Sequence, residues 1–195
     1  MCTIITADRV TWDANHADFV DRIYEDAKHN PDGYSLIMVG DRSDQVSVMR
    51  SMDIEMLLNA LWSSDWQRFW LHTRHATGAA RGLTACHAFS AKYKGTEWYV
   101  MHNGIIRHNE SNHFPVDSEW IASLINRYGP EAAINTVAHN EGFANCFIIA
   151  PSTGKWYVLR LQSGNLYVSE SGDNFSTVRM PKLIDNPVKE GMYQL

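Results

Sequence analysis

Three features are scarce or missing in this sequence of 195 residues: cysteine, long apolar runs and excess positive charge. With 3 cysteines no disulfide framework is expected, and at least one thiol of a monomer stays free. No stretch reaches the roughly 20 apolar residues that span a bilayer, and the N-terminus lacks the basic and apolar regions of a signal peptide. We therefore expect a cytoplasmic protein with no membrane contact.

The charge balance and the histidine spacing argue against two further classes of partner. The net charge of -5 gives no electrostatic reason to expect a polyphosphate ligand, so nucleic acid is not expected as a direct partner. No Cys-x-x-Cys or Glu-x-x-His pair occurs near the histidines between positions 72 and 108, and their spacing matches no zinc pattern. We expect neither a metal nor a cofactor.

The order of the predicted elements indicates an α+β layer architecture. The composition is 45% hydrophobic and 20% charged, as in globular proteins, and no linker or repeat divides the chain, so we expect one domain over residues 1–195. Residue patterns predict strands and helices along the whole chain. The strands are expected at residues 2–7, 34–40, 46–50, 69–74, 97–104, 143–150, 155–161 and 165–171, and the helices at residues 18–28, 53–64, 117–129 and from Pro130 onward, with a loop at residues 75–91.

Polar residues gather where several of these strands end, which is where a rigid scaffold positions functional loops. Arg74 follows bulky residues, precedes small ones and has no acidic residue within eight positions. It is therefore either half of a structural ion pair with a distant carboxylate or a group that binds a ligand carboxylate. Asp117, at the start of a predicted helix, has the opposite charge, so the two would fit the carboxylate and ammonium of an amino acid.

The segment "HNG" that ends the strand at residues 97–104 has two possible meanings. The amide of Asn103 and the backbone N–H of Gly104 are two donors that could point to one place, as an oxyanion hole requires. Asn-Gly is also the commonest pair in tight turns. The segment alone does not choose between these meanings.

Cys2 directly follows the initiator methionine, which also leaves two interpretations open. It is either a small residue at the head of a strand or, once Met1 is removed, a residue with both a free thiol and a free amine. Such an amine is able to take the proton of its own thiol. Cys86 and Cys146 lie in small or apolar surroundings and are expected in the core, although surface reactivity of Cys86 stays open.

Six segments, taken in order, resemble the glutaminase domain of class II glutamine amidotransferases, which belong to the N-terminal nucleophile (Ntn) hydrolase superfamily. The similarity covers nearly the whole chain. The segments are "MCTI", "HNPDGYS", "HTRHATGAA", "ACHAF", "HNGIIRHN" and "DSEWI". The resemblance implies a four-layer αββα sandwich in which two mostly antiparallel sheets are covered by helices.

The resemblance also implies roles for individual residues. After removal of Met1, Cys2 would attack the side-chain amide of glutamine, form a γ-glutamyl thioester and release ammonia. Asn103 and Gly104 would stabilise the oxyanion. The residues expected to bind the substrate are Arg74 for its carboxylate, Asp117 for its ammonium, and Thr77, Gly78 and His87 as parts of the pocket wall.

Three alternatives stay open on the sequence alone. Because the resemblance extends nearly to the C-terminus, either a separate synthase subunit accepts the ammonia or the protein is a simple hydrolase. An Ntn amidase acting on a γ-glutamyl conjugate or another linear amide would keep the same residues. A non-catalytic binding or assembly module with the Ntn fold is the third reading, since a retained Met1 would block the amine of Cys2.

Overall fold

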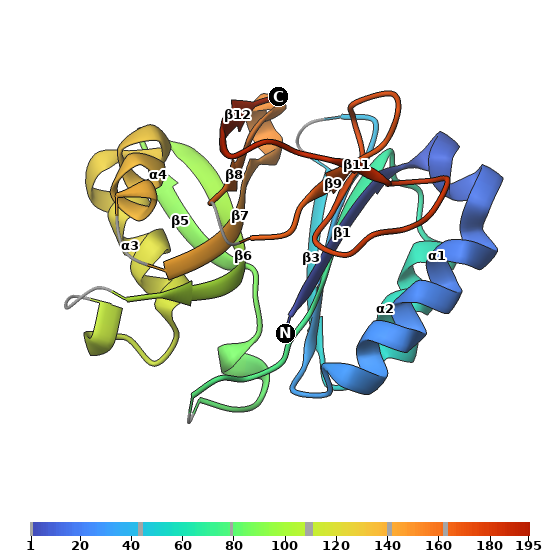
Figure 1. Ribbon diagram of the computed structural model, residues 1–195, viewed down its shortest axis with the longest axis horizontal. Coiled ribbons are helices and arrows are strands. Elements are labelled where there is room, and N and C mark those ends of the chain that lie inside the picture. The colour runs from blue at the N-terminus through green and yellow to red at the C-terminus, as the bar shows by residue number, and fades with distance from the viewer. Residues whose placement is uncertain (1, 43–44, 79, 108–110, 140–141, 162–163) are drawn as a thin grey trace.

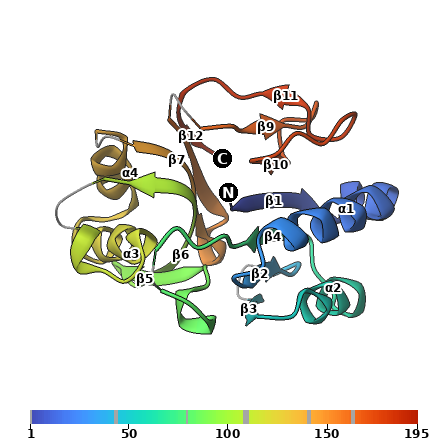
Figure 2. The ribbon, with the colours of Figure 1, turned by 60° about the horizontal axis from the view of Figure 1, so that its bottom comes forward.

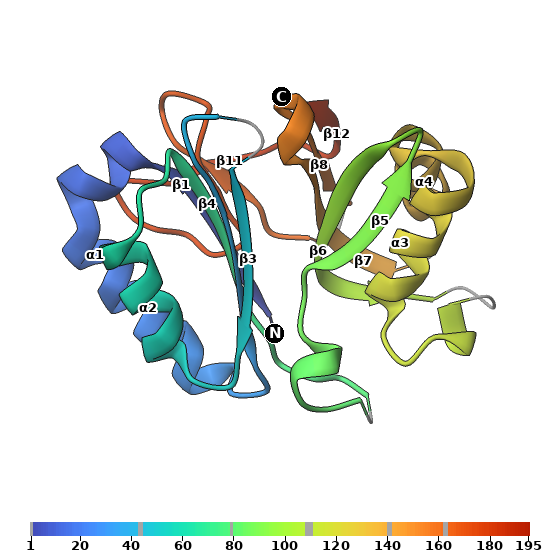
Figure 3. The same ribbon diagram turned by 180° about the vertical axis from the view of Figure 1, so that it is seen from behind.

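The computed structural model describes residues 2–42, 45–78, 80–107, 111–139, 142–161 and 164–195. Two antiparallel sheets lie face to face, and two helices cover the outer face of each (Figure 1). Figure 3 shows the same four layers from behind, with α1 and α2 on one outside and α3 and α4 on the other. This arrangement confirms the predicted α+β class and the αββα sandwich.

The first sheet carries the N-terminus. In the described residues its strand order is β11-β9-β10-β1-β4-β2-β3, and every pair is antiparallel. Its strands are β1 (Thr3–Asp8), β2 (Tyr34–Val39), β3 (Val46–Ser51), β4 (Arg68–Thr73), β9 (Tyr167–Val168), β10 (Phe175–Ser176) and β11 (Asn186–Pro187), and its helices are α1 (Arg9–His29) and α2 (Ile54–Ser63).

The second sheet has the strand order β12-β8-β7-β6-β5 across the described residues. Its strands are β5 (Phe89–Tyr93), β6 (Thr96–Ile106), β7 (Gly142–Ala150), β8 (Lys155–Arg160) and β12 (Gly191–Gln194), and its helices are α3 (Asp117–Tyr128) and α4 (Pro130–Ala138). Figure 2 shows α3 lying against β5 and β6, which positions its first turn near the end of β6. No helix in the described part of the chain is both long and apolar enough to cross a membrane.

Alternation of side chains along the strands sorts the apolar residues into three layers. Ile4, Trp70 and Met101 face the space between the sheets and form one cluster there. Ile5 points the other way, into the layer under α1 and α2, and Val100 points into the layer under α3 and α4. The same alternation decides which polar residues at the strand ends face the opposite sheet.

Helix α1 begins at Arg9, so the prediction that it begins at residue 18 was wrong. Asp8 is its N-cap, because the Asp8 carboxylate accepts the backbone N–H of Thr11 at 2.7 Å. Asn15 has non-helical angles, φ -139° and ψ 24°, that kink the helix. The kink separates the first residues of the helix from the apolar spacing at residues 19–27 on which the prediction rested.

One loop prediction and one strand prediction were also wrong. The predicted loop at residues 75–91 runs into β5, which pairs with β6 through the turn at Lys94 and Gly95. Small and charged residues in "FSAKYKG" hide this short strand. The strand predicted at residues 165–171 shrinks to the two residues of β9.

Candidate active site

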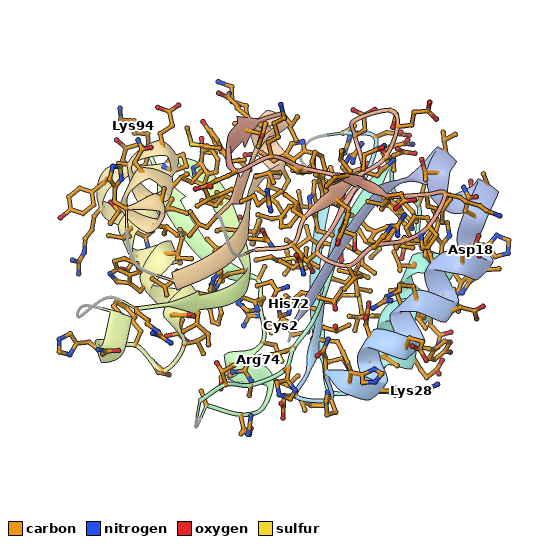
Figure 4. All side chains as sticks on the ribbon, in the orientation of Figure 1. Cys2, Asp18, Lys28, His72, Arg74 and Lys94 are labelled. Atoms are coloured by element: carbon orange, nitrogen blue, oxygen red, sulfur yellow. The ribbon has the colours of Figure 1, made fainter. Side chains whose placement is uncertain are left out.

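Strand register places Cys2 beside Arg74. β1 and β4 pair with Thr3 opposite Thr73, so the residue before β1 lies next to the residue after β4. The backbone of His75 holds the sulfur: its N–H lies 3.3 Å from the Cys2 Sγ, and the thiol lies 3.4 Å from the His75 carbonyl. Figure 4 shows Cys2 and Arg74 together in the middle of the molecule, far apart in sequence but adjacent in space.

The Cys2 thiol is partly buried, and burial raises its pKa above the ordinary value. The backbone hydrogen bond from His75 and the charge of Arg74 oppose this shift without cancelling it, and the Asp117 charge adds to it. At neutral pH the sulfur therefore keeps its proton unless a base removes it.

The segment "NPDG" between α1 and β2 braces the loop that follows β4. The carbonyl of Gly33 accepts the N–H of Arg74 at 2.8 Å, and the Asp32 carboxylate accepts the N–H of Ala76 at 2.8 Å. Gly33 has φ +126°, and a Cβ there would lie 2.2 Å from the Cys86 Sγ. Only glycine fits this position. Through its hydrogen bonds to residues 74 and 76, the motif fixes the backbone conformation at Arg74.

Arg74 is a buried cation without a protein counter-charge in the described structure. Its residue is 5% exposed, its Nη1 has no hydrogen-bond partner among the described atoms, and no ion pair of the described residues includes it. By alternation along β4, its side chain lies on the same face as that of Trp70, toward the second sheet. The alternative of a structural ion pair is therefore not seen, and the guanidinium is free to bind an anion.

Asn103 and Gly104 lie inside β6, so the tight-turn reading of "HNG" was wrong. They pair with Asn145 and Ala144 of β7. Asn103 shares the face of Met101 and points toward the first sheet, where it is 4% exposed. Gly104 has φ +146°, a conformation that other residues rarely adopt. A backbone turned in this way at a strand end can direct an N–H out of the ladder.

Asp117 is the first residue of α3 rather than its cap, which is Val116. Its carboxylate accepts the N–H of Ile106 at 3.1 Å and lies 3.4 Å from the Nδ1 of His102. Burial alone raises the pKa of the Asp117 carboxyl. His102 and the backbone N–H groups of Ile106 and Ser118 outweigh burial and lower this pKa below its ordinary value. Asp117 is therefore a carboxylate at neutral pH.

These residues line one cavity of about 250 Å³. Seven of the eight predicted site residues contribute to its wall, and Gly78, which is exposed, does not. The complete lining is Cys2, Arg74, His75, Thr77, His87, His102, Asn103, Gly104, Ile105, Val116 and Asp117. The structure therefore brings together residues from both sheets and from α3.

Four lining residues were not among the predicted site residues: His75, His102, Ile105 and Val116. His75 contributes through its backbone, which no side-chain pattern reports. The position of His102 could have been predicted. It directly precedes Asn103 on a strand, so its side chain points to the opposite face of the sheet, toward α3 and its first residue Asp117. Met1 and the end of "HNGIIRHN", residues 108 and 109, lie outside the described residues.

The other two cysteines are buried away from solvent, as expected. Cys86 and Cys146 are each 1% exposed, and burial raises the pKa of both thiols. Neither lines the cavity. Of the three thiols, Cys2 is the one placed for chemistry.

The sequence matches no family model and no curated protein sequence. Solved structures do share its fold. An allosteric regulatory enzyme of purine biosynthesis superposes with a TM-score of 0.67 at 13% identity, over 100% of this chain and 46% of that one. A glutamine phosphoribosylpyrophosphate amidotransferase from B. subtilis does so with a TM-score of 0.66 at 13% identity, over 100% of this chain and 49% of that one.

The chain thus spans about half the length of these two proteins. At 13% identity the likeness concerns the fold. The chain has the Ntn-hydrolase-like fold of the class II glutamine amidotransferases.

Proposed function

We propose that this protein is a glutaminase of the class II amidotransferase type, which releases ammonia from the side-chain amide of glutamine. One observation carries the proposal: the unpaired, buried cation of Arg74 shares a cavity with the Cys2 thiol and the Asp117 carboxylate. A buried charge without a partner is costly, and a substrate carboxylate supplies the partner. Packing alone gives no reason for these three groups to meet.

The cavity suits a small zwitterion. Arg74 binds the α-carboxylate, and Asp117 binds the α-ammonium, which orients the side chain of the substrate toward Cys2. The volume of about 250 Å³ lies below the roughly 300–1,000 Å³ typical of sites for drug-sized ligands. An amino acid is the appropriate size.

The chemistry begins with removal of Met1, which frees the amine of Cys2. Because burial raises the pKa of the thiol, a base is needed, and this amine takes the proton directly or through a water. The sulfur then bonds to the amide carbon. The Asn103 amide and the Gly104 N–H stabilise the oxyanion, where one donor is worth about 3 kcal/mol.

Collapse of this tetrahedral intermediate breaks the C–N bond, and the departing nitrogen takes the proton and leaves as ammonia. Water then attacks the thioester, which returns glutamate and the free thiol. Thr77 and His87 complete the wall around the substrate. We place the reaction in the cytoplasm and in a single domain spanning residues 1–195.

The direct test measures ammonia released from glutamine by the processed protein. We expect turnover in the wild type and a loss of at least about 10³-fold in Cys2→Ala, as for removal of other nucleophiles. Cys146→Ala is the matched control, because it removes a buried thiol that does not line the cavity. Equal activity in Cys2→Ala and the wild type would contradict the proposal.

A second candidate keeps the mechanism and changes the leaving group to that of a γ-glutamyl conjugate. It is favoured by the mouth of the cavity, where the lining residues His75 and Thr77 are exposed beside the half-buried Cys2. A substituent on the amide nitrogen would extend there into solvent. Turnover of γ-glutamyl amides with negligible ammonia from glutamine would establish this amidase instead.

The proposed glutaminase either supplies its ammonia to a synthase or, as a simple hydrolase, releases all of it into solution. A non-catalytic module is the remaining alternative, and it requires that Met1 is retained. Intact mass decides that question, because a mature chain is lighter by one methionine.

A further inference from the structure

Three buried histidines from three separate segments are linked to one serine of α3, two of them directly and the third through its neighbour. His72 of β4, His87 before β5 and His102 of β6 are 0%, 3% and 2% exposed, and Ser118 is 0% exposed. The mechanism above uses none of them as an acid or a base. His87 and His102 line the cavity, whereas Ser118 and His72 do not.

The contacts form one continuous chain of hydrogen bonds that ends at Asp117. The His87 Nε2 lies 2.5 Å from the Ser118 Oγ, and the His102 Nδ1 lies 3.2 Å from the same oxygen. The Asp117 Oδ1 lies 3.4 Å from both the Ser118 Oγ and the His102 Nδ1. On the far side of His87, its Nδ1 lies 3.2 Å from the Nδ1 of His72.

The hydrogen-bonding capacities of these groups limit where the protons lie. Burial lowers the pKa of His72 to about 3 and the pKa of His87 well below its ordinary value, so both rings are neutral at neutral pH. A neutral imidazole has one donor and one acceptor nitrogen, and the Asp117 carboxylate only accepts. His102 therefore donates to Asp117 through Nδ1.

Two proton orders satisfy the rest of the chain. Either Ser118 donates to His87 and His87 donates to His72, or His72 donates to His87, His87 to Ser118 and Ser118 to Asp117. In both orders the Ser118 hydroxyl is the junction at which the His87 and His102 branches meet. Removal of this hydroxyl leaves the His87 Nε2 without its partner and, in the second order, also removes a hydrogen bond to the Asp117 carboxylate.

Building on the glutaminase proposed above, we infer that Ser118 is a positioning residue for the ammonium site. Its hydroxyl ties His87 and His102 to Asp117 and keeps that carboxylate turned toward the α-ammonium of the substrate. Since Ser118 does not line the cavity, it acts on the substrate only through these neighbours.

The test compares glutamine with 4-carbamoylbutanoate, which is glutamine without its α-amino group. The readout is the ratio of kcat/KM for the two substrates, with kcat and KM determined separately. We expect Ser118→Ala to lower this ratio about tenfold, through a higher KM for glutamine with kcat within about twofold, because the hydrogen bond it removes is worth a factor of this order. Asp117→Asn should lower the ratio further.

Two variants control for effects on folding. Ser118→Thr keeps a hydroxyl and should restore most of the ratio. Ser123→Ala, on the same helix, removes a serine whose hydroxyl donates to the Trp120 carbonyl, and it should leave the ratio unchanged. If Ser118→Ala does not fold, Ser118→Cys replaces it, because a thiol has a similar size and weaker hydrogen bonds.

The outcomes separate this inference from the proposed function. Wild-type turnover of glutamine supports the glutaminase, and a lower ratio in Ser118→Ala supports the positioning role. Equal loss on both substrates in Ser118→Ala would show a merely structural role and overturn the inference alone. Failure of the wild type to release ammonia from glutamine would overturn the glutaminase and this inference with it.

Discussion

The two sides of the cavity contribute charges of opposite sign, and these charges differ in how the surrounding protein is hydrogen-bonded to them. The first sheet presents Arg74, whose Nη1 is buried without a hydrogen-bond partner among the described residues. The second sheet and α3 present Asp117, whose carboxylate is already bonded to Ile106 and flanked by His102 and Ser118. One charge is left open for a ligand, and the other is held in place before any ligand arrives.

This difference separates the binding of substrate from the stability of the fold. An unpaired buried charge costs stability that only a bound partner returns, whereas a hydrogen-bonded carboxylate supports the protein at all times. The two sides of the site should therefore respond differently to mutation. Replacement of Arg74 and replacement of Asp117 should change stability in opposite directions while both reduce activity.

The largest expected effect is on activity in Arg74→Met. This change removes the cation that we propose binds the substrate carboxylate, and we expect kcat/KM for glutamine to fall by about 10²–10³-fold, mainly through KM. The free energy of unfolding should stay the same or rise by about 1 kcal/mol, because no protein partner of the guanidinium is lost. Steady-state kinetics and urea denaturation measure the two quantities. A large loss of stability would show that Arg74 is part of a structural pair.

The opposite response is expected from Asp117→Ala. Ile106 and His102 lose their acceptor, so the free energy of unfolding should fall by about 1–3 kcal/mol. Glutamine turnover should fall as well, because the ammonium loses its counter-charge. Urea denaturation measures this loss of stability. Asp53→Ala, which removes the N-cap carboxylate of α2, is the control, because it shows how much stability is lost when an ordinary acid at a helix terminus is removed. An unchanged stability would contradict the account of this side.

The smallest effect concerns pH. Burial lowers the pKa of His72 from 6.5 to about 3, so the folded state resists a proton that the unfolded chain binds. The stability contribution of neutral His72 is therefore complete above about pH 6.5 and falls as the pH drops toward about 3, by at most about 1.4 kcal/mol per pH unit. Urea denaturation at several pH values should show that the free energy of unfolding changes less with pH in His72→Asn than in the wild type. The same pH dependence in both proteins would mean that His72 is not held neutral.

Much of the fold followed from local patterns in the sequence. The strands that follow Cys2, precede Arg74 and contain Asn103 alternate or run apolar as buried strands do. The helix from Asp117 was marked by its apolar spacing. What failed had a local cause: the kink at Asn15 separates the first residues of α1 from the apolar spacing that marks the rest of the helix, and β5 is short and mixed in composition. Neither feature leaves a clear periodic signal.

Most residues of the candidate site could be predicted from the sequence, but the hydrogen bonds between them could not. Resemblance to family motifs supplied Cys2, Arg74 and Asp117, and the structure places all three around one cavity. The link from His87 through Ser118 to Asp117 joins elements that are about 30 residues apart, and it depends on packing between β6, α3 and the loop before β5. Spacing along a chain does not encode such a convergence.

The most direct test of the central claim is a mass measurement on the purified protein after exposure to a glutamine-mimicking electrophile. The account predicts a chain lighter by one methionine that carries a single adduct, mapped to Cys2 and lost when free glutamine is present in excess. A chain that retains Met1 and takes up no label, or one labelled only at Cys86, would contradict it.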